Sequence, residues 1–438
     1  MGIPAYFAQI IKKYKDILKK SADFKKDFHT LYLDANSIIY DAVHEIESSG
    51  EMKPIPSDNF EYISATVCKK IQAYINEIRP SNTVYIAFDG VAPFAKMKQQ
   101  RNRRFMASFM ELNGLVPKQV FSTLQITPGT DFMIFLSKYV DTYFQSKQSL
   151  RIIVSGADEK GEGEQKIIKH IRENGKRENK TIIYGLDADL IMLSINVHEK
   201  TQMYLYREVE EELHILCIES LCLHIREEIG SEYDYVFLCF LLGNDFLPHF
   251  PALYVRNNGI EKLMNCYREV GMKIIVDGEV QWDAVNRIFT CLGKNEERWM
   301  IEYSKRKKRY SEDINDAPEM FTEVEEYVNP RERGWESRYY KSVHHGKSKE
   351  EIVENYIEGL NWVWRYYSKE CVDWRWKSVV KTGALLKDIK RCRRMKEKKR
   401  ETTIEEQEEN ILPKGEEGKR KKIEWCYVKY IWEGEVCS

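Results

Sequence analysis

Seven carboxylates stand at points of the sequence where they could bind metal ions together. They are Asp34, Asp89, Glu162, Glu164, Asp187, Asp189 and Asp245. Asp34, Asp89 and Asp187 each follow a short apolar run typical of a strand, and open α/β sheets place their ligand sites at strand ends. Seven negative charges held close together would repel one another and raise one another's pKa values unless cations neutralise them. The pattern therefore predicts a shared metal site.

The ligand types favour Mg²⁺ or Mn²⁺ over zinc, because the set contains oxygen ligands only. Two such ions about 4 Å apart stabilise the attacking and leaving oxygens of an in-line phosphoryl displacement. A single acid at a strand end is more often a helix cap or a solvated turn. Asp187-Ala188-Asp189, however, interrupts an apolar stretch that continues to Leu193, where charges need paired or metal-bound partners.

A basic segment follows Gly90-Val91-Ala92-Pro93 and has the composition of a helix. Lys96, Gln100, Arg103 and Arg104 are spaced by +4, +7 and +8, so they share one face of that helix. Such a face suits a phosphate dianion, because guanidinium groups bind phosphate oxygens in pairs. The alternative is an ordinary solvated basic face.

The elements that must hold these residues alternate, from residue 1 to about 270, between short strand-like runs and longer helix-like stretches. This rhythm is typical of an α/β domain. The chain has 438 residues, a formal net charge of -1 and 43% hydrophobic residues, which excludes a disordered or fibrous protein. No apolar run approaches the roughly 20 residues of a membrane span, so we expect a soluble protein. Ten cysteines without a Cys-x-x-Cys pair favour an intracellular, reducing compartment.

Two later segments have unusual composition. Residues 335–376 are dense in tryptophan and tyrosine, which is typical of a core, although some of these rings could stack on bases. Residues 387–400 hold nine Lys/Arg against two acids, and Glu-rich residues follow. We interpret this stretch as a charged insertion in preference to a nuclear-import or RNA-contacting patch.

The motifs together resemble the XRN family of 5′→3′ exoribonucleases. The matching segments are residues 1–4, 31–37, 88–93, 96–104, 126–130, 161–164, 184–193 and 243–249, in the family's order. Residues 334–341, 356–363 and 374–376 resemble the second conserved region of the family, and the long C-terminal extensions of larger members have no counterpart. The resemblance is to a compact member.

The resemblance implies a PIN-like α/β nuclease core, with a central, mainly parallel sheet flanked by helices and a helical, aromatic-rich second region packed on it. It implies three parts: a nuclease core over 1–265, a connector over 266–330, and a reduced second region over 331–438 with a charged insertion at about 387–422. The seven acids would be the catalytic, metal-binding set. Lys96, Gln100, Arg103 and Arg104 would bind the 5′-monophosphate of RNA.

The sequence departs from the family pattern near the predicted site. Tyr40 occupies the place of a histidine that stacks on the 5′ base; a tyrosine ring can still stack but cannot carry a positive charge. Lys160 and Gln165 stand where Pro and His are usual, and neither change removes a carboxylate. Activity is therefore expected to survive.

The leading hypothesis is a two-metal, Mg²⁺- or Mn²⁺-dependent 5′→3′ exoribonuclease. It would degrade 5′-monophosphorylated single-stranded RNA to mononucleotides, in RNA decay or processing. We expect it to act as a monomeric catalytic unit and not to associate with a membrane. The alternatives are a flap-type endonuclease, a non-catalytic RNA-binding scaffold, and a phosphatase with an Asp-x-Asp nucleophile. For the compartment, the lack of a zinc-knuckle insertion favours the cytoplasmic branch of the family, whereas residues 236–240 and the basic run favour the nuclear branch.

Overall fold

The computed structural model describes most of the chain up to residue 389. The described residues are 3, 6–114, 121–145, 150–209, 212–253, 255–313, 327–343, 346–379 and 382–389. Most of the predicted charged insertion at 387–422 therefore lies outside the described residues. So does the side chain of Arg103.

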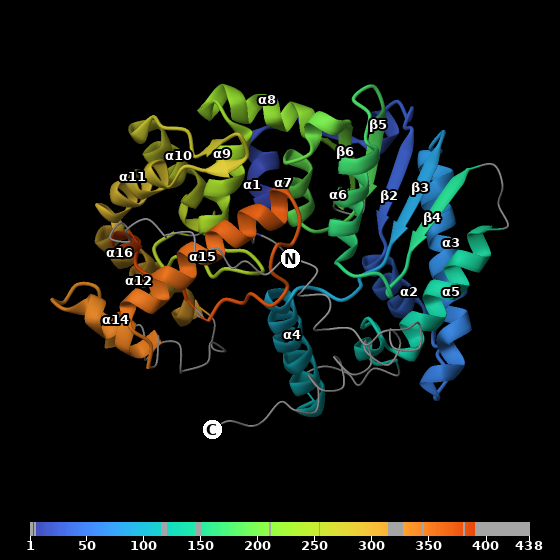
Figure 1. Ribbon diagram of the computed structural model, residues 1–438. Coiled ribbons are helices and arrows are strands. Elements are labelled where there is room, and N and C mark those ends of the chain that lie inside the picture. Colours follow the sequence, from blue (N-terminus) through green and yellow to red (C-terminus); the bar gives the residue numbers. More distant parts are fainter. Residues whose placement is uncertain are drawn as a thin grey trace, which may run out of the picture.

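A mixed sheet of seven strands lies between helices on its two faces in the part of the chain that the structure describes (Figure 1). The strands, in spatial order, are β1 (Leu18–Lys20), β7 (Glu212–Cys217), β6 (Gln202–Val209), β5 (Lys180–Tyr184), β2 (Thr30–Asp34), β3 (Thr83–Ala87) and β4 (Arg151–Ser155). From β6 to β4 all neighbours run parallel, and β7 runs antiparallel to both β6 and β1. This arrangement confirms the predicted central, mainly parallel sheet.

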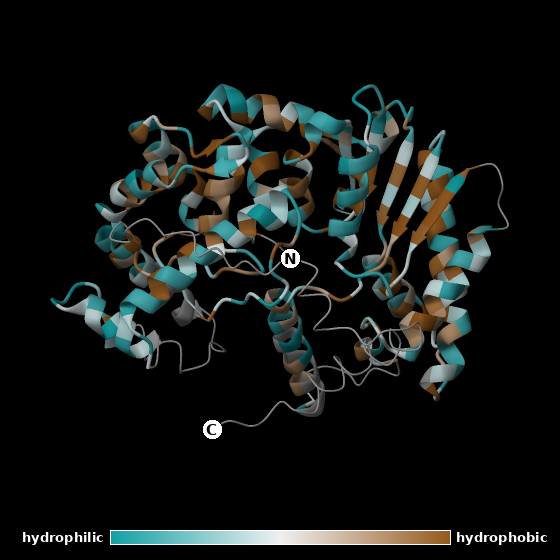
Figure 2. Cartoon of the chain, in the orientation of Figure 1, coloured by the Kyte–Doolittle hydropathy of each residue, from teal (hydrophilic) through white to brown (hydrophobic). Residues whose placement is uncertain are grey.

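Each face of the sheet carries its own apolar layer, because side chains alternate along a strand. In β2, Leu31 and Leu33 face one layer and Tyr32 faces the other. This two-sided burial explains why the strands are apolar runs (Figure 2). Helices α2 (Asn36–Ser49), α3 (Phe60–Ile78) and α5 (Asp131–Gln145) contribute to the Leu31 layer; α6 (Gly163–Asn174), α7 (Asp189–Ile195), α8 (Ile218–Ile229) and α9 (Glu232–Cys239) contribute to the Tyr32 layer.

A helical region packs on the Tyr32 layer and shares its apolar core. Its elements are α10 (Gly259–Val270), β8 (Ile275–Val276), β9 (Glu279–Val280), α11 (Trp282–Gly293), α12 (Glu296–Asp313), α14 (Trp335–Val343), α15 (Lys349–Ser368) and α16 (Leu386–Ile389). Trp362 is buried and stacks on Tyr366 and Trp376, with ring centroids 5.0 and 4.9 Å apart. The aromatic-rich second region is thus a packed core, as predicted, while the three domain boundaries stay a prediction.

The order of the strands creates a switch point between β2 and β5. The chain builds β2, β3 and β4 in one direction and then returns to add β5 and β6 on the other side of β2. Leu33 pairs with Tyr184, so the carboxyl ends of β2 and β5 are neighbours. Ligands of open α/β sheets bind outside this edge. In the described segments, no helix combines the length and apolar character needed to cross a bilayer.

Candidate active site

The predicted acids gather at the carboxyl ends of the parallel strands. Asp34 is the last residue of β2, and the turn into α6 lies directly against it. A Cβ at Gly163 would stand 2.7 Å from Asp34 Oδ1 and 3.5 Å from Asp89 Oδ1. The Gly163 amide also donates a 2.7 Å hydrogen bond to Asp89 Oδ1. The absence of a side chain at Gly163 is therefore what lets Glu162 and its neighbours approach the strand ends.

Asp89 is held from a second side by Asn36, at the start of α2. The Asn36 side-chain amide donates to Asp89 Oδ2 over 2.8 Å, and the Asp89 backbone N–H donates to Asn36 Oδ1 over 2.9 Å. These paired bonds fix both the backbone and the carboxylate of Asp89. The orientation of this acid is therefore set before any substrate arrives.

Lys96 lies inside the acidic cluster. Its Nζ is 2.6 Å from Glu162 Oε1 and 2.6 Å from Asp245 Oδ2, and the three side chains are only 7%, 5% and 3% exposed. Gln99, also on α4 (Phe94–Leu112), donates to Asp245 as well. The structure thus places the first member of the predicted phosphate-binding face against the acids. Its role toward a 5′-phosphate stays a prediction.

The other members of that basic face lie further along α4. Gln100 and Arg104 are half-buried, one and two turns beyond Lys96. The contacts with Asp245 come from Lys96 and Gln99, in the first turns of the helix. A phosphate pocket made by all four side chains stays a prediction.

The electrostatics of the cluster show a shortage of positive charge. Burial, with the charges of neighbouring acids, raises the pKa values of Asp34 and Glu164 well above their ordinary range and also raises the pKa of Asp89. For Asp189 the same causes raise the pKa to about 7. Glu164 Oε2 and Asp189 Oδ1 are buried without a hydrogen-bond partner among the described residues. A buried carboxylate oxygen without a partner is costly, so these residues fit a bound cation.

Two tyrosines of the second region reach the acids from α15, and sequence reasoning did not identify them. The Tyr366 hydroxyl donates a 2.8 Å hydrogen bond to Glu162 Oε2, and Tyr367 interacts with Asp189. Burial raises the pKa values of both hydroxyls well above 10, so each stays a donor at neutral pH. The only available signal was the aromatic density of residues 335–376, which predicts a core and not these contacts.

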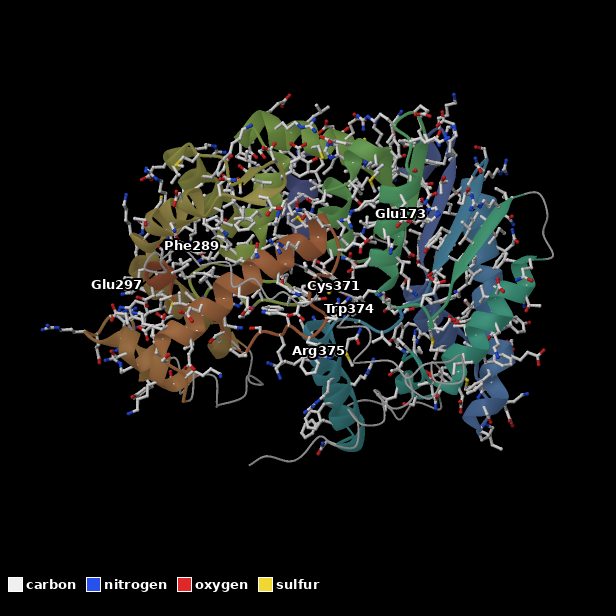
Figure 3. The ribbon with its side chains drawn as sticks, in the orientation of Figure 1. Glu173, Phe289, Glu297, Cys371, Trp374 and Arg375 are labelled. Carbon is white, nitrogen blue, oxygen red and sulfur yellow. The ribbon has the colours of Figure 1, made fainter. Side chains whose placement is uncertain are left out.

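The aromatic residues considered for base stacking are only partly placed by the structure. Tyr40 is 45% exposed on α2, one turn beyond Asn36. Trp374 lies beside the start of α4 (Figure 3), where its carbonyl accepts a 2.9 Å hydrogen bond from the Phe94 backbone N–H. The Lys160 ammonium lies 5.7 Å from the centroid of the Trp374 ring. Stacking of Tyr40 on a base stays a prediction.

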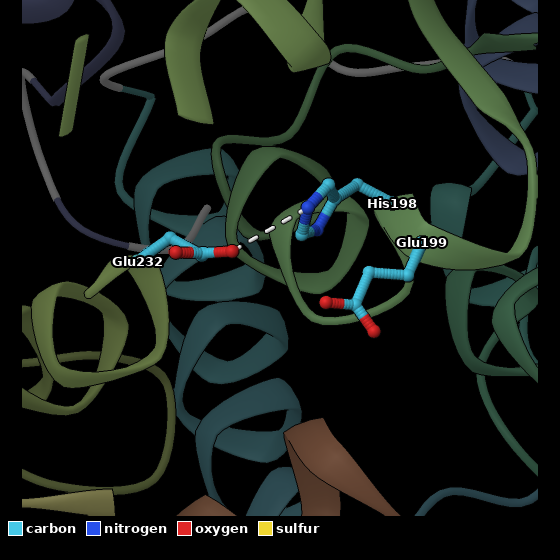
Figure 4. Close-up of side chains that lie close together, drawn as sticks. All are labelled: His198, Glu199 and Glu232. Atoms are coloured by element: carbon cyan, nitrogen blue, oxygen red, sulfur yellow. Dashed lines mark ion pairs between the residues drawn. The ribbon is translucent and has the colours of Figure 1, made fainter. Parts of the chain in front are cut away.

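A separate cluster, outside the seven acids, has the spacing of a metal site. His198, Glu199 and Glu232 offer ligand atoms within 4.8 Å of one another, and no three of the seven acids do so in the described part of the chain (Figure 4). Arg226 explains this cluster, because its guanidinium binds Glu232 and lies 2.6 Å from His198 Nε2. His198 Nδ1 is 2.7 Å from the Ile195 carbonyl. The group is a neutralised structural network.

The fold and the site together define an α/β protein with a buried acidic cluster at the switch point of its sheet. A family model described as the XRN 5′-3′ exonuclease N-terminus matches residues 1–209, and one described as the Xrn1 helical domain matches residues 232–328 and 304–412. The two matches cover most of the chain. The chain belongs to the XRN 5′→3′ exonuclease family.

Curated relatives extend the same similarity. The 5′-3′ exoribonuclease 2 of Gallus gallus is 27% identical over 86% of this chain and 59% of its own length, and its Drosophila melanogaster homologue is 25% identical over 86% and 60%. The 5′-3′ exoribonuclease 1 of Saccharomyces cerevisiae is 31% identical over 61% of this chain and 21% of its own length. The chain therefore spans 60% or less of these relatives. The match to the Gallus protein runs over 575 residues against a chain of 438, so the relative holds insertions.

Proposed function

We propose that the protein is a metal-dependent 5′→3′ exoribonuclease that degrades 5′-monophosphorylated single-stranded RNA to mononucleotides. The observation that carries this proposal is the gathering of the predicted acids at the switch point of the sheet, around the ammonium of Lys96. Curated relatives named 5′-3′ exoribonucleases support the direction and the substrate class.

The acidic cluster would hold Mg²⁺ or Mn²⁺, in our proposal two ions. Bound cations would activate water for attack on a phosphodiester and neutralise charge that develops on its oxygens. The chain's own residues orient the acids: Asn36 and the Gly163 amide fix Asp89, and Tyr366 fixes Glu162. Burial excludes bulk water from Glu162 and Asp189, which strengthens electrostatic interactions there.

The 5′-phosphate would be bound by the same helix that supplies Lys96. Lys96 has one positive charge and two carboxylate partners. Once a bound cation neutralises these carboxylates, its ammonium becomes available to a phosphate, together with Gln100, Arg103 and Arg104. A pocket that closes around a monophosphate would exclude capped and triphosphorylated ends.

The proposal is tested with one RNA that bears a 5′-monophosphate, a 5′-triphosphate or a 5′-hydroxyl end. Each form is incubated with Mg²⁺ or EDTA and with wild-type protein, Asp187→Ala, or Asp283→Ala as a control at an exposed acid on α11. We expect mononucleotides from the monophosphate form alone, only with metal, and from the wild type and the Asp283 variant. Internal fragments from all three ends would instead establish an endonuclease, and binding without cleavage would establish a scaffold.

A further inference from the structure

Two buried cations lie behind the acidic cluster without touching its carboxylates. Lys166 on α6 is 7% exposed, and Arg207 on β6 is 8% exposed. Neither forms an ion pair with another described residue at contact distance. Both donate to main-chain carbonyls instead, which is unusual, because a buried charge is normally balanced by a direct counter-charge.

Two of the carbonyls that accept these bonds belong to the residues immediately before acids of the cluster. Lys166 Nζ donates over 2.9 Å to the carbonyl of Phe88, which precedes Asp89, and over 2.7 Å to the carbonyl of Gly156. Arg207 Nη2 donates to the carbonyl of Leu186, which precedes Asp187. Two cations from different elements thus make the same kind of contact with two different strand ends.

The geometry of the peptide bond turns this contact into control of the acids. The carbonyl of one residue and the N–H of the next lie in one plane. A cation that fixes the Phe88 carbonyl therefore fixes the peptide plane that leads into Asp89, and the same holds for Leu186 and Asp187.

Burial lowers the pKa of Lys166 to about 8 and that of Arg207 to about 10, while the nearby acids oppose this effect.

Arg207 also connects the acidic cluster to the N-terminal helix. Its guanidinium lies 4.1 Å from the centroid of the Phe7 ring on α1 (Tyr6–Lys13), a cation–π geometry. One of its nitrogens, Nη1, is buried without a hydrogen-bond partner among the described residues. The guanidinium of Arg207 is thus held by the Phe7 ring against its face and by the Leu186 carbonyl at Nη2.

We propose that Lys166 and Arg207 are positioning residues that lock the Phe88–Asp89 and Leu186–Asp187 peptide planes and so aim both carboxylates into the acidic cluster. The inference rests on the proposed function, since it assigns these acids a metal-binding role. It also implies that the orientation of the Asp187 carboxylate depends on α1, because the Phe7 ring of α1 contacts Arg207. Groups that orient metal ligands typically change metal affinity or activity by about 10- to 100-fold when they are removed.

The test measures Mn²⁺ binding without RNA, by electron paramagnetic resonance, and then kcat and KM with Mg²⁺ on 5′-monophosphorylated RNA. Lys166→Met and Arg207→Met keep the apolar stems and remove the charge and the donors. We expect the Mn²⁺ dissociation constant to rise at least about tenfold and kcat to fall by a similar factor, with the KM for RNA nearly unchanged. Arg207→Lys should recover little of the loss, because the guanidinium lies over the Phe7 ring while its Nη2 donates to the Leu186 carbonyl, and a compact ammonium does not offer both contacts.

A matched control is Arg338→Met, which removes a guanidinium that also donates to main-chain carbonyls, those of Val328 and Asn329, outside the acidic cluster. It should lower the thermal unfolding midpoint and leave Mn²⁺ binding and kcat unchanged. If the Arg207 variants do not fold, Phe7→Leu removes the stacked ring while all donors and acceptors stay, and it should weaken Mn²⁺ binding in the same direction.

Folded Lys166→Met and Arg207→Met variants with wild-type Mn²⁺ affinity would overturn the inference. Full rescue by Arg207→Lys would overturn the dependence on the Phe7 ring. A wild-type protein that binds Mn²⁺ but releases no nucleotides would overturn the exoribonuclease proposal instead. In that case the comparison of Mn²⁺ affinities still decides whether Lys166 and Arg207 position the acids.

Discussion

The hydroxyl of Tyr366 donates a 2.8 Å hydrogen bond to Glu162 Oε2, across 204 residues of sequence. This bond joins α15 of the helical region to the turn that opens α6. The ring of Tyr366 is at the same time part of a stack with Trp362. The second conserved region is therefore part of the acidic cluster and not a separate appendage, because a shift of α15 would move a direct partner of Glu162.

Tyr366→Phe removes this hydrogen bond and keeps the packed ring. We expect kcat on 5′-monophosphorylated RNA to fall about 3- to 10-fold and the free energy of unfolding to fall by about 1 kcal/mol, the usual net contribution of one hydrogen bond. Steady-state kinetics and urea unfolding measure the two effects. Tyr340→Phe, which removes a bond to Asp388 outside the cluster, is the control and should affect stability alone.

Lys96→Met removes the ammonium that lies between Glu162 and Asp245. Without RNA, we expect the variant to bind Mn²⁺ about tenfold more tightly, because a competing positive charge is gone. On 5′-monophosphorylated RNA it should show a raised KM, because the proposed contact with the terminal phosphate is lost. Calorimetric Mn²⁺ titration and steady-state kinetics provide the measurements.

Lys98→Met is the control for this prediction. Lys98 lies on the same helix, and its Nζ donates to the Ser378 carbonyl. An unchanged Mn²⁺ affinity in Lys96→Met would show that the ammonium does not compete with a bound cation.

Gly163→Ala would place a methyl group 2.7 Å from Asp34 Oδ1 and 3.2 Å from the Ala87 carbonyl. One of these groups must move, so we expect kcat to fall about 100-fold, the typical effect of a misplacement near 1 Å. The cost to stability should be about 1–3 kcal/mol, as for other overpacked sites. Kinetics and thermal unfolding on the same preparation separate the two.

The same substitution at Gly230 is a useful comparison. Gly230 ends α8 with a φ of +81° and has no atom within 4 Å of a built Cβ. Gly230→Ala should cost about 1 kcal/mol of backbone strain and leave kcat unchanged. Equal losses of kcat in both variants would refute the steric account at Gly163.

Glu296 predicts a specific dependence of stability on pH. Burial raises the pKa of this carboxyl to about 7, although it accepts hydrogen bonds from the backbone N–H groups of Leu386 and Lys387 at the start of α16. As the pH rises, the unfolded chain releases the Glu296 proton near pH 4.5 and the folded chain near pH 7. The contribution of Glu296 is therefore fully present below pH 4.5, decreases between pH 4.5 and 7, and is constant above.

The measurement is the free energy of unfolding of wild type minus that of Glu296→Gln, from pH 4 to 8. We expect this difference to decrease by up to about 1.4 kcal/mol per pH unit inside the window and to be flat outside it. Subtracting the free energy of unfolding of the glutamine variant removes the contribution of all other titrating groups. A difference that increases with pH would mean that the two backbone hydrogen bonds outweigh burial.

Local pattern was enough to predict the strand ends and the acids at them. Asp34, Asp89 and Asp187 follow apolar runs that are strands in the structure, and parallel strands bring such ends to one edge. The helix that begins at Phe94 was also predictable from its composition. These features depend on neighbouring residues, which the sequence shows directly.

Contacts between distant segments could not be predicted from the same patterns. Spacing on a helix indicates that Lys96 and Gln100 share a face, but it does not indicate that Lys96 reaches Asp245, 149 residues away. The contact of Tyr366 with Glu162 depends on the packing of α15 against the α/β core. Arg207 has no local signal at all, because its partner is the carbonyl of Leu186 on another strand end.

The distance in sequence between Glu162 and Tyr366 also sets an order of assembly during synthesis. Contacts of high sequence separation form late, because long loops must close first. In a growing chain β2 to β6 and Asp245 are synthesised before α15, so Tyr366 can reach Glu162 only after all seven acids are present. For a protein proposed to digest RNA, this order would make the contacts from α15 the last ones to reach the acids.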